Sequence, residues 1–247
     1  MKKISAVAVC LVCVIIACVA GGYSSVFAAQ RKIPVYCVDR QDNKVSISFD
    51  AAWGADKTRQ IMDVCEQYNV RATFFLVGFW VDKYPELTKE IQQRGFEIGT
   101  HSMTHPQMSK LSRENVIKEL SESADKITKL TSVPVTLFRP PFGDYNNQLI
   151  ECAEQLGLYT IQWSVDSLDW KGLDARSIAE RVQKMKSGDI ILCHNNSDHI
   201  VEALPLIFSA AESKGLTFVP VGELIYKENF TVDHTGKQSA LLNGEGT

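Results

Sequence analysis

The sequence predicts one α/β domain whose parallel strands form a distorted (β/α) barrel of about seven strands. Three observations support this class. Short apolar runs alternate with segments of helical periodicity from Lys44 to about Tyr226, and such alternation is typical of parallel sheets. The 247 residues are enough for one large domain, and no linker divides them. An open doubly wound sheet is the alternative, but no Gly-rich phosphate loop follows the first strand.

The first elements are marked by periodicity and by residues typical of helix ends. Residues 45–49 alternate as a strand, and apolar side chains then recur at helical spacing over about 56–68. The β-branched and aromatic run 72–77 predicts a second strand. Pro85 in the first turn and Gly95 after the last turn bound the next helix.

The same alternation continues to residue 219. Ser112 is predicted to cap a long charged helix that ends near Thr131. The remaining predicted strands are residues 96–99, 136–138, 159–164, 189–193 and 216–219. The remaining predicted helices are residues 146–156, 175–186 and 200–214.

The N-terminus has the pattern of a secretory signal peptide. Lys2 and Lys3 precede the uncharged apolar run Ile4–Ala20, and Val26-Phe27-Ala28 suits signal peptidase. Residues 1–28 are therefore predicted to be removed after Ala28. The alternative is an uncleaved anchor, which would hold the protein at the membrane, although the run is slightly short for a span of about 20 residues.

The rest of the chain divides into three parts. Residues 29–43 form an N-terminal segment, residues 44–227 the barrel domain, and residues 228–247 a polar tail predicted to be flexible. The net charge of −3 and the lack of a basic run argue against nucleic acid as the partner. A monomer that acts on an extended, weakly charged substrate is expected.

Four cysteines lie outside the signal segment, widely spaced and without any CxxC motif: Cys37, Cys65, Cys152 and Cys193. One or two disulfides are compatible with export, and four buried thiols are equally compatible.

Chemically active side chains follow the predicted strands one after another. They are Asp50, His101, Arg139, Asp166 and His194. Parallel barrels carry their active sites at the carboxyl ends of the strands, so these side chains should converge. Asp166 also suits a turn. His101 and His105, four residues apart, either share a divalent ion or form a polar surface pair.

Five motifs, in order, carry a family resemblance: SFDAAWG, HSMTH, RPPFG, SVDSLDW and IILCH. They resemble those of the polysaccharide deacetylases with a NodB homology domain, carbohydrate esterase family 4. The resemblance covers about Lys44 to Tyr226. It implies a hydrolase that removes N-acetyl groups from a cell-wall polysaccharide such as peptidoglycan, with a divalent metal, usually zinc. SFDAAWG also resembles the sporulation-associated branch, which implies export to the cell wall or spore envelope.

The resemblance implies a role for each matched residue. Asp50 would be the general base, oriented by Arg139, and His194 the general acid, supported by Asp169. His101 and His105 would bind the metal. The backbone amide near Phe142 would help hold the oxyanion. Trp170 and Trp53 would form the walls of the groove that binds the sugar.

One position departs from the family pattern. The family usually has two adjacent aspartates where this chain has Asp50 and Ala51, and the second is the third metal ligand. Two imidazoles alone make an incomplete site. Asp56 is the alternative third ligand, but it is better placed to cap the following helix. Two functions follow, an N-deacetylase with a weakened metal site or a glycan-binding or assembly protein without turnover. Retention of the predicted acid and base favours the enzyme.

Overall fold

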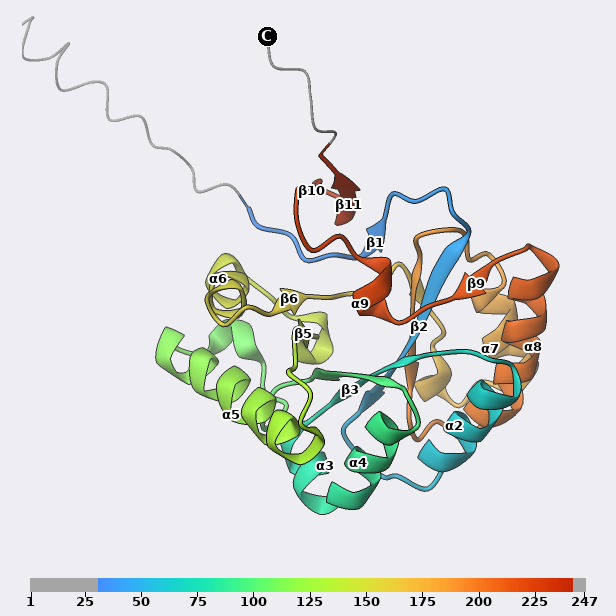
Figure 1. The fold of residues 1–247 in the computed structure, drawn as a ribbon, viewed down its shortest axis with the longest axis horizontal. Helices are drawn as coiled ribbons and strands as arrows, with labels where there is room; N and C mark the ends of the chain where they lie inside the picture. The colour runs from blue at the N-terminus through green and yellow to red at the C-terminus, as the bar shows by residue number, and fades with distance from the viewer. Residues whose placement is uncertain (1–30, 242–247) are drawn as a thin grey trace, which may run out of the picture. The chain divides into compact units, whose positions relative to one another are not determined.

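The structure is a computed structural model that describes residues 31–241 (Figure 1). The compact body begins at Lys32, and the predicted signal peptide lies outside the described residues. Within residues 31–241, no helix is long and apolar enough to cross a membrane.

A single parallel sheet organises the body. Its strands lie in the order β6-β5-β4-β3-β2-β8-β7, and β9 pairs with the start of β2. The sheet curls into a half-barrel, which confirms the predicted fold class. The strands are β2 (Lys44–Ala51), β3 (Thr73–Leu76), β4 (Glu97–Thr100), β5 (Leu137–Phe138), β6 (Tyr159–Thr160), β7 (Val165–Asp166), β8 (Ile190–His194) and β9 (Thr217–Phe218).

The predicted strand at 159–164 is shorter in the structure: only Tyr159–Thr160 form β6, and β7 begins at Val165, just after the predicted range. The Gln162 N–H donates to the Val35 carbonyl, and the Ser164 N–H donates to the Ile190 carbonyl. Between the two short strands, the backbone therefore bonds first to the N-terminal segment at Val35 and then to β8 at Ile190. β6 and β7 consequently lie at opposite ends of the sheet, although they follow each other in the chain.

The larger helices surround the sheet on its outer side (Figure 1). They are α2 (Thr58–Gln67), α3 (Gly78–Lys83), α4 (Pro85–Gln93), α5 (Arg113–Thr131), α6 (Asn147–Gln155), α7 (Ala175–Val182) and α8 (Ile200–Ser213), with the short α9 (Val221–Leu224) near the end of the chain. Ser112 caps α5 as predicted, because its side chain accepts the Asn115 N–H. Asp56 does not cap α2, which begins after Lys57 without a side-chain cap.

Strand β2 carries apolar side chains on its outer face and polar side chains on its inner face. Val45, Ile47, Phe49 and Ala51 belong to the apolar cluster between sheet and helices. The alternate residues Ser46, Ser48 and Asp50 are also buried, but they lie on the opposite face. The outer layer therefore stabilises the strand, while its inner face carries polar groups toward the barrel interior.

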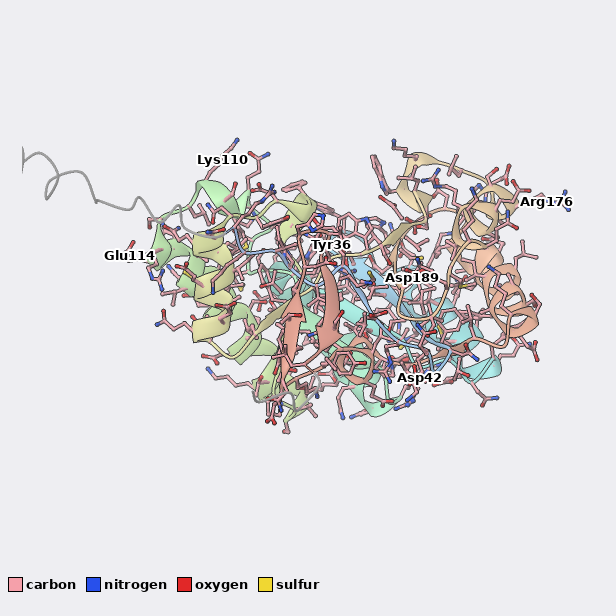
Figure 2. All side chains as sticks on the ribbon, turned by 90° about the horizontal axis from the view of Figure 1, so that it is seen from above. Tyr36, Asp42, Lys110, Glu114, Arg176 and Asp189 are labelled. Atoms are coloured by element: carbon pink, nitrogen blue, oxygen red, sulfur yellow. The ribbon has the colours of Figure 1, made fainter. Side chains whose placement is uncertain are left out.

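Both ends of the described chain meet in a small second sheet. β1 (Cys37–Val38) pairs in parallel with β11 (Lys237–Ala240), which pairs antiparallel with β10 (Phe230–Val232). Tyr36 lies beside this hairpin, with its N–H bonded to the Gly236 carbonyl (Figure 2). The prediction of a flexible tail over 228–247 is therefore wrong for residues 230–240, whose pairing with β1 orders them. Residues 242–247 lie outside the described part.

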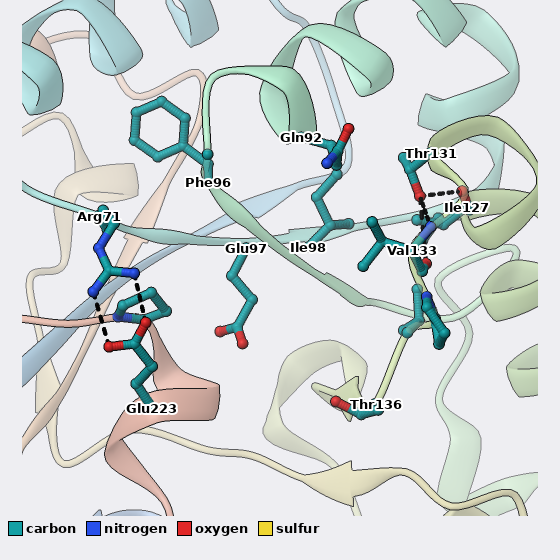
Figure 3. Close-up of a pocket in the computed structure, with 14 residues that line it drawn as sticks. Arg71, Gln92, Phe96, Glu97, Ile98, Ile127, Thr131, Val133, Thr136 and Glu223 are labelled. Atoms are coloured by element: carbon teal, nitrogen blue, oxygen red, sulfur yellow. Dashed lines mark hydrogen bonds and ion pairs between the residues drawn. The ribbon is translucent and has the colours of Figure 1, made fainter.

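A pocket of about 290 Å³ lies where β3 and β4 begin, at the opposite end of the strands from Asp50 and His194 (Figure 3). Glu97 there accepts the Thr73 hydroxyl and the Gly222 N–H, and so joins α9 to the sheet. The four cysteines of the described chain are free thiols, and all but the partly exposed Cys37 are buried.

Candidate active site

The predicted site residues converge at the carboxyl ends of the strands. Eight of them line one cavity of about 640 Å³: Asp50, Trp53, His101, His105, Phe142, Asp169, Trp170 and His194. The ninth, Arg139, is fully buried directly against Asp50. Asp166 also lines the cavity, and its carboxylate accepts the Leu168 N–H in a turn, as its alternative reading predicts.

The first ionic pair joins strand β2 to the residue after β5. Arg139 Nη1 donates to Asp50 Oδ1 at 2.8 Å. Burial raises the pKa of Asp50, but the charge of Arg139, the charge of His194 and the Arg139 hydrogen bond outweigh it, so the pKa of Asp50 lies below its usual range. Asp50 is therefore a carboxylate at neutral pH.

The second pair joins the end of β8 to the turn after β7. His194 Nδ1 lies 2.8 Å from Asp169 Oδ1, and the His194 backbone N–H donates to Asp169 Oδ2 at 2.8 Å. Burial lowers the pKa of His194, but the hydrogen bond and the charge of Asp169 raise it by more. The pKa of His194 therefore lies above its usual value. With Nδ1 held by Asp169, Nε2 is the ring nitrogen left for a substrate.

The two remaining histidines are held as neutral imidazoles. His101 Nδ1 donates to the Arg139 carbonyl at 2.7 Å, because a carbonyl can only accept, and its Nε2 lies 3.5 Å from Asp50 Oδ2. Burial lowers the pKa of His101 below its usual value. Burial also lowers the pKa of His105 to about 4, and the neighbouring His101 adds to this effect.

These imidazoles do not complete a divalent metal site. The rings of His101 and His105 are 4.9 Å apart and edge to face. Among residues 31–241, no group of three or more His, Cys, Asp or Glu side chains could hold an ion. Ala51 is fully buried in the apolar layer, and Asp56 is exposed and outside the cavity lining. The donor set therefore does not fit a closed zinc site, which takes four ligands.

Aromatic side chains form the rim of the cavity. Trp53, Phe142 and Trp170 are 64%, 63% and 58% exposed, a level unusual for large apolar side chains at a concave surface. The ring centroids of Trp53 and Phe142 lie 4.9 Å and 4.6 Å from that of His105. Flat exposed rings around a pocket suit stacking against the apolar face of a sugar.

Further residues of the site were not predicted from the sequence. Trp163 and Leu192 line the cavity, and Phe75 lies under the Arg139 guanidinium at 4.1 Å. The buried Asn195 amide donates to the Gly54 carbonyl and to Thr58 Oγ1 at the start of α2, so it joins the loops that follow Asp50 and His194. Ser48 contacts Arg139. A signal for Ser48 exists in the alternation of VSISFD, where each second residue is polar.

Comparison with known proteins shows the family. The model of the polysaccharide deacetylase family matches residues 38–161. A peptidoglycan-N-acetylglucosamine deacetylase of Bacillus cereus is 35% identical over 194 residues, which cover 76% of this chain and 91% of that protein. The chain therefore belongs to the polysaccharide deacetylase family, carbohydrate esterase family 4.

Other relatives differ in length and in activity. The peptidoglycan-N-acetylglucosamine deacetylase PgdA of Listeria monocytogenes is 32% identical over 208 residues, 84% of this chain but 43% of PgdA, so the chain spans less than half of that protein. The structure of BA3943 from Bacillus anthracis, described as a CE4 family pseudoenzyme, matches with a TM-score of 0.75 and 30% identity over 78% of this chain and 68% of BA3943. A BA3943 mutant with restored enzymatic activity also matches with a TM-score of 0.75.

Proposed function

We propose that this protein is a hydrolase that removes N-acetyl groups from N-acetyl amino sugars of a cell-wall polysaccharide of the peptidoglycan type, outside the cytoplasm. The observation that carries the proposal is the pairing of an ionised carboxylate, Asp50, with a histidine of raised pKa, His194, in one aromatic-lined cavity. Opposite pKa shifts in one cavity are the pattern of a general base and a general acid.

The reaction follows from this placement. Asp50 Oδ1 is held by Arg139, so Oδ2 is free to take a proton from a water molecule as the water oxygen attacks the acetamide carbonyl carbon. His194 Nε2 then gives its proton to the amide nitrogen as the C–N bond breaks. The products are acetate and the free amine of the sugar. Asp169 stabilises the imidazolium before transfer.

A metal has no assigned step in this proposal. In this family a divalent ion would polarise the carbonyl, but the described residues supply only two imidazoles and one carboxylate, Asp50, whose Oδ1 is held by Arg139. The chain's own residues therefore account for proton transfer and orientation. Stabilisation of the oxyanion by the backbone near Phe142 stays a prediction.

A second function is favoured by the same donor set. Replacement of the usual second aspartate by Ala51, together with the likeness to a CE4 pseudoenzyme, suits a protein that binds glycan in the aromatic groove without turnover. The sporulation-associated role and a place in the spore envelope apply to either function. They rest on the resemblance of SFDAAWG alone.

One experiment separates the two functions. Acetate release from peptidoglycan and from chitin oligomers is measured with and without added zinc, for the mature protein and for Asp50→Asn. Glycan binding is measured in parallel. The hydrolase is supported by release that Asp50→Asn abolishes while binding persists. Binding without release from any glycan, with or without metal, would support the second function, and loss of both would contradict both.

A further inference from the structure

We infer that Ser48 is a positioning residue of this site, whose hydroxyl fixes the Arg139 guanidinium in the orientation that holds Asp50. Its catalytic meaning rests on the proposed hydrolase function. The contact itself does not.

The direction of the hydrogen bonds at Ser48 is determined by its partners. Ser48 Oγ donates its one proton to the Ile191 carbonyl at 2.7 Å, because a carbonyl cannot donate. Arg139 Nη1 donates to the same oxygen at 2.8 Å, because a guanidinium cannot accept. The hydroxyl is therefore anchored to β8 and presents a lone pair to Arg139. A freely rotating hydroxyl would not give the guanidinium a fixed acceptor.

Apart from the bonds of Nη1, the Arg139 guanidinium has few hydrogen bonds that fix its orientation. Its two Nη1 hydrogens are divided between Ser48 Oγ and Asp50 Oδ1, each at 2.8 Å. Nη2 donates to the Gln162 carbonyl at the longer distance of 3.2 Å. Nε is buried without a hydrogen-bond partner in the described chain. The Phe75 ring below supports the plane but not the rotation of the group within that plane.

Loss of the Ser48 hydroxyl therefore acts on Asp50 through Arg139. One Nη1 hydrogen would be left buried without an acceptor, which is costly beside an already unpartnered Nε. Rotation of the guanidinium to another acceptor would relieve this cost. That rotation would weaken the Asp50 bond and change which carboxylate oxygen faces the cavity.

The same strand supplies a matched control. Ser46 lies on the same face of β2, is equally buried, and donates to the Val219 carbonyl at 2.6 Å. No contact joins Ser46 to Arg139 among its described hydrogen bonds. Ser46→Ala and Ser48→Ala thus each remove a buried hydroxyl that donates to a neighbouring carbonyl, and only Ser48→Ala removes an acceptor from Arg139.

The test compares Ser48→Ala, Ser48→Thr and Ser46→Ala in the mature protein. The first readout is the ¹⁵N NMR spectrum of the Arg139 guanidinium, whose signals are assigned by their loss in Arg139→Lys. The rates of hydrogen exchange and of rotation at Nη1 are measured from it. The second is kcat and KM for acetate release. Ser48→Ala is expected to accelerate Nη1 exchange and rotation and to lower kcat by about tenfold or more with little change in KM. Ser48→Thr should restore both, and Ser46→Ala should leave both near wild type.

Each outcome decides the inference. Equal Nη1 exchange in Ser48→Ala and Ser46→Ala would overturn it, as would an equal kcat in an active enzyme. If the wild type releases no acetate, the proposed hydrolase fails, while the NMR comparison still decides whether Ser48 fixes Arg139. If Ser48→Ala does not fold, Ser48→Cys takes its place, because a thiol of similar size is a poor acceptor.

Discussion

Asp50 and His194 differ in their protonation because their buried partners carry opposite charges. The Arg139 guanidinium stabilises the carboxylate form of Asp50, and the Asp169 carboxylate stabilises the imidazolium form of His194. In both cases burial opposes the charged form. The charged partner therefore decides the protonation state of each residue. Without Arg139, burial should raise the pKa of Asp50, and without Asp169, burial should lower the pKa of His194.

Asp169→Asn tests this reasoning at the acid. The protonated form of His194 is present below its raised pKa and is lost as the pH rises through it. Without the Asp169 charge, burial remains and lowers that pKa, so the basic limb of the acetate-release profile should move to lower pH. Turnover at neutral pH should fall by about tenfold or more. An unchanged basic limb in a folded, active variant would remove Asp169 from the mechanism.

The same pair should contribute to stability in a defined pH window. Since the folded-state pKa of His194 is raised, the stabilisation is fully present below the unfolded pKa of about 6.5 and is lost as the pH rises through the folded value. The difference in unfolding free energy between wild type and Asp169→Asn should therefore be larger at pH 6 than at pH 9. Urea unfolding at both pH values measures this.

Ala51→Asp tests the missing ligand. The Ala51 side chain is fully buried in the apolar layer, so an added carboxylate should lower stability in the absence of metal. Zinc should reverse this loss if the carboxylate turns toward His101 and His105, since an anionic oxygen completes the donor set. We expect tighter zinc binding and retained or higher acetate release at limiting zinc. His101→Ala should abolish both effects.

Zinc titration with unfolding and acetate assays on the same samples checks this expectation. Ala51→Asn, of the same shape but without charge, is the control and should gain little affinity. Zinc affinity no better in Ala51→Asp than in wild type would show that position 51 cannot reach the imidazoles. Tight zinc binding without acetate release from any glycan would instead favour the glycan-binding function.

At the scale of elements, strand β2 carries one site residue that the sequence predicts, Asp50, and one that it does not, Ser48. Asp50 marks the end of this strand in the sequence, because it is a charged residue directly after an apolar run. The role of Ser48 has no such mark in the sequence, because it depends on Arg139, which lies 91 residues away in the chain. Contacts of this kind follow from the pairing of strands and not from local periodicity.

The β10–β11 hairpin was missed for a related reason. Its strands are only three and four residues long and lie among polar residues and glycine, so this region has the composition of a tail. Their order comes from pairing with β1 and from Gln238, which is fully buried. The Gln238 amide donates to the Tyr226 carbonyl and accepts the Tyr226 N–H, each at 2.8 Å.

Gln238→Ala should therefore destabilise the protein. It leaves the Tyr226 N–H and carbonyl without partners, and the expected loss is about 1–3 kcal/mol of unfolding free energy. Urea unfolding measures it. Ser239→Ala, at the next and more exposed position of the strand, should change stability by less than about 0.5 kcal/mol. Equal stability of the two variants would show that the hairpin does not stabilise the barrel.

At the scale of the whole molecule, the order of strands and helices was predictable because each element is marked locally. Alternation of apolar residues and the ends of helices gave the parallel α/β class, which the sheet confirms. The convergence of the site followed from that class alone. The split between β6 and β7 and the second sheet did not follow, because both depend on residues near Val35 and Cys37 that precede the periodic region.

This N-terminal segment defines how much of the chain the fold requires. The body begins at Lys32, whose N–H donates to Asn147 Oδ1 at 2.9 Å and whose ammonium group pairs with Glu154. Cleavage after Ala28 would leave these contacts and β1 intact. Cleavage at that position is therefore compatible with the described fold.

We therefore expect exported protein to begin at or near Ala29. N-terminal sequencing and intact-mass measurement of protein recovered outside the cytoplasm check this, since the apolar run Ile4–Ala20 and the site at Val26-Phe27-Ala28 predict export with cleavage. Protein produced without residues 1–28 should match the exported form in its urea unfolding curve. A full-length species that stays in the membrane fraction would show that the segment is an anchor. The proposed active site would then reach only glycan close to the membrane surface.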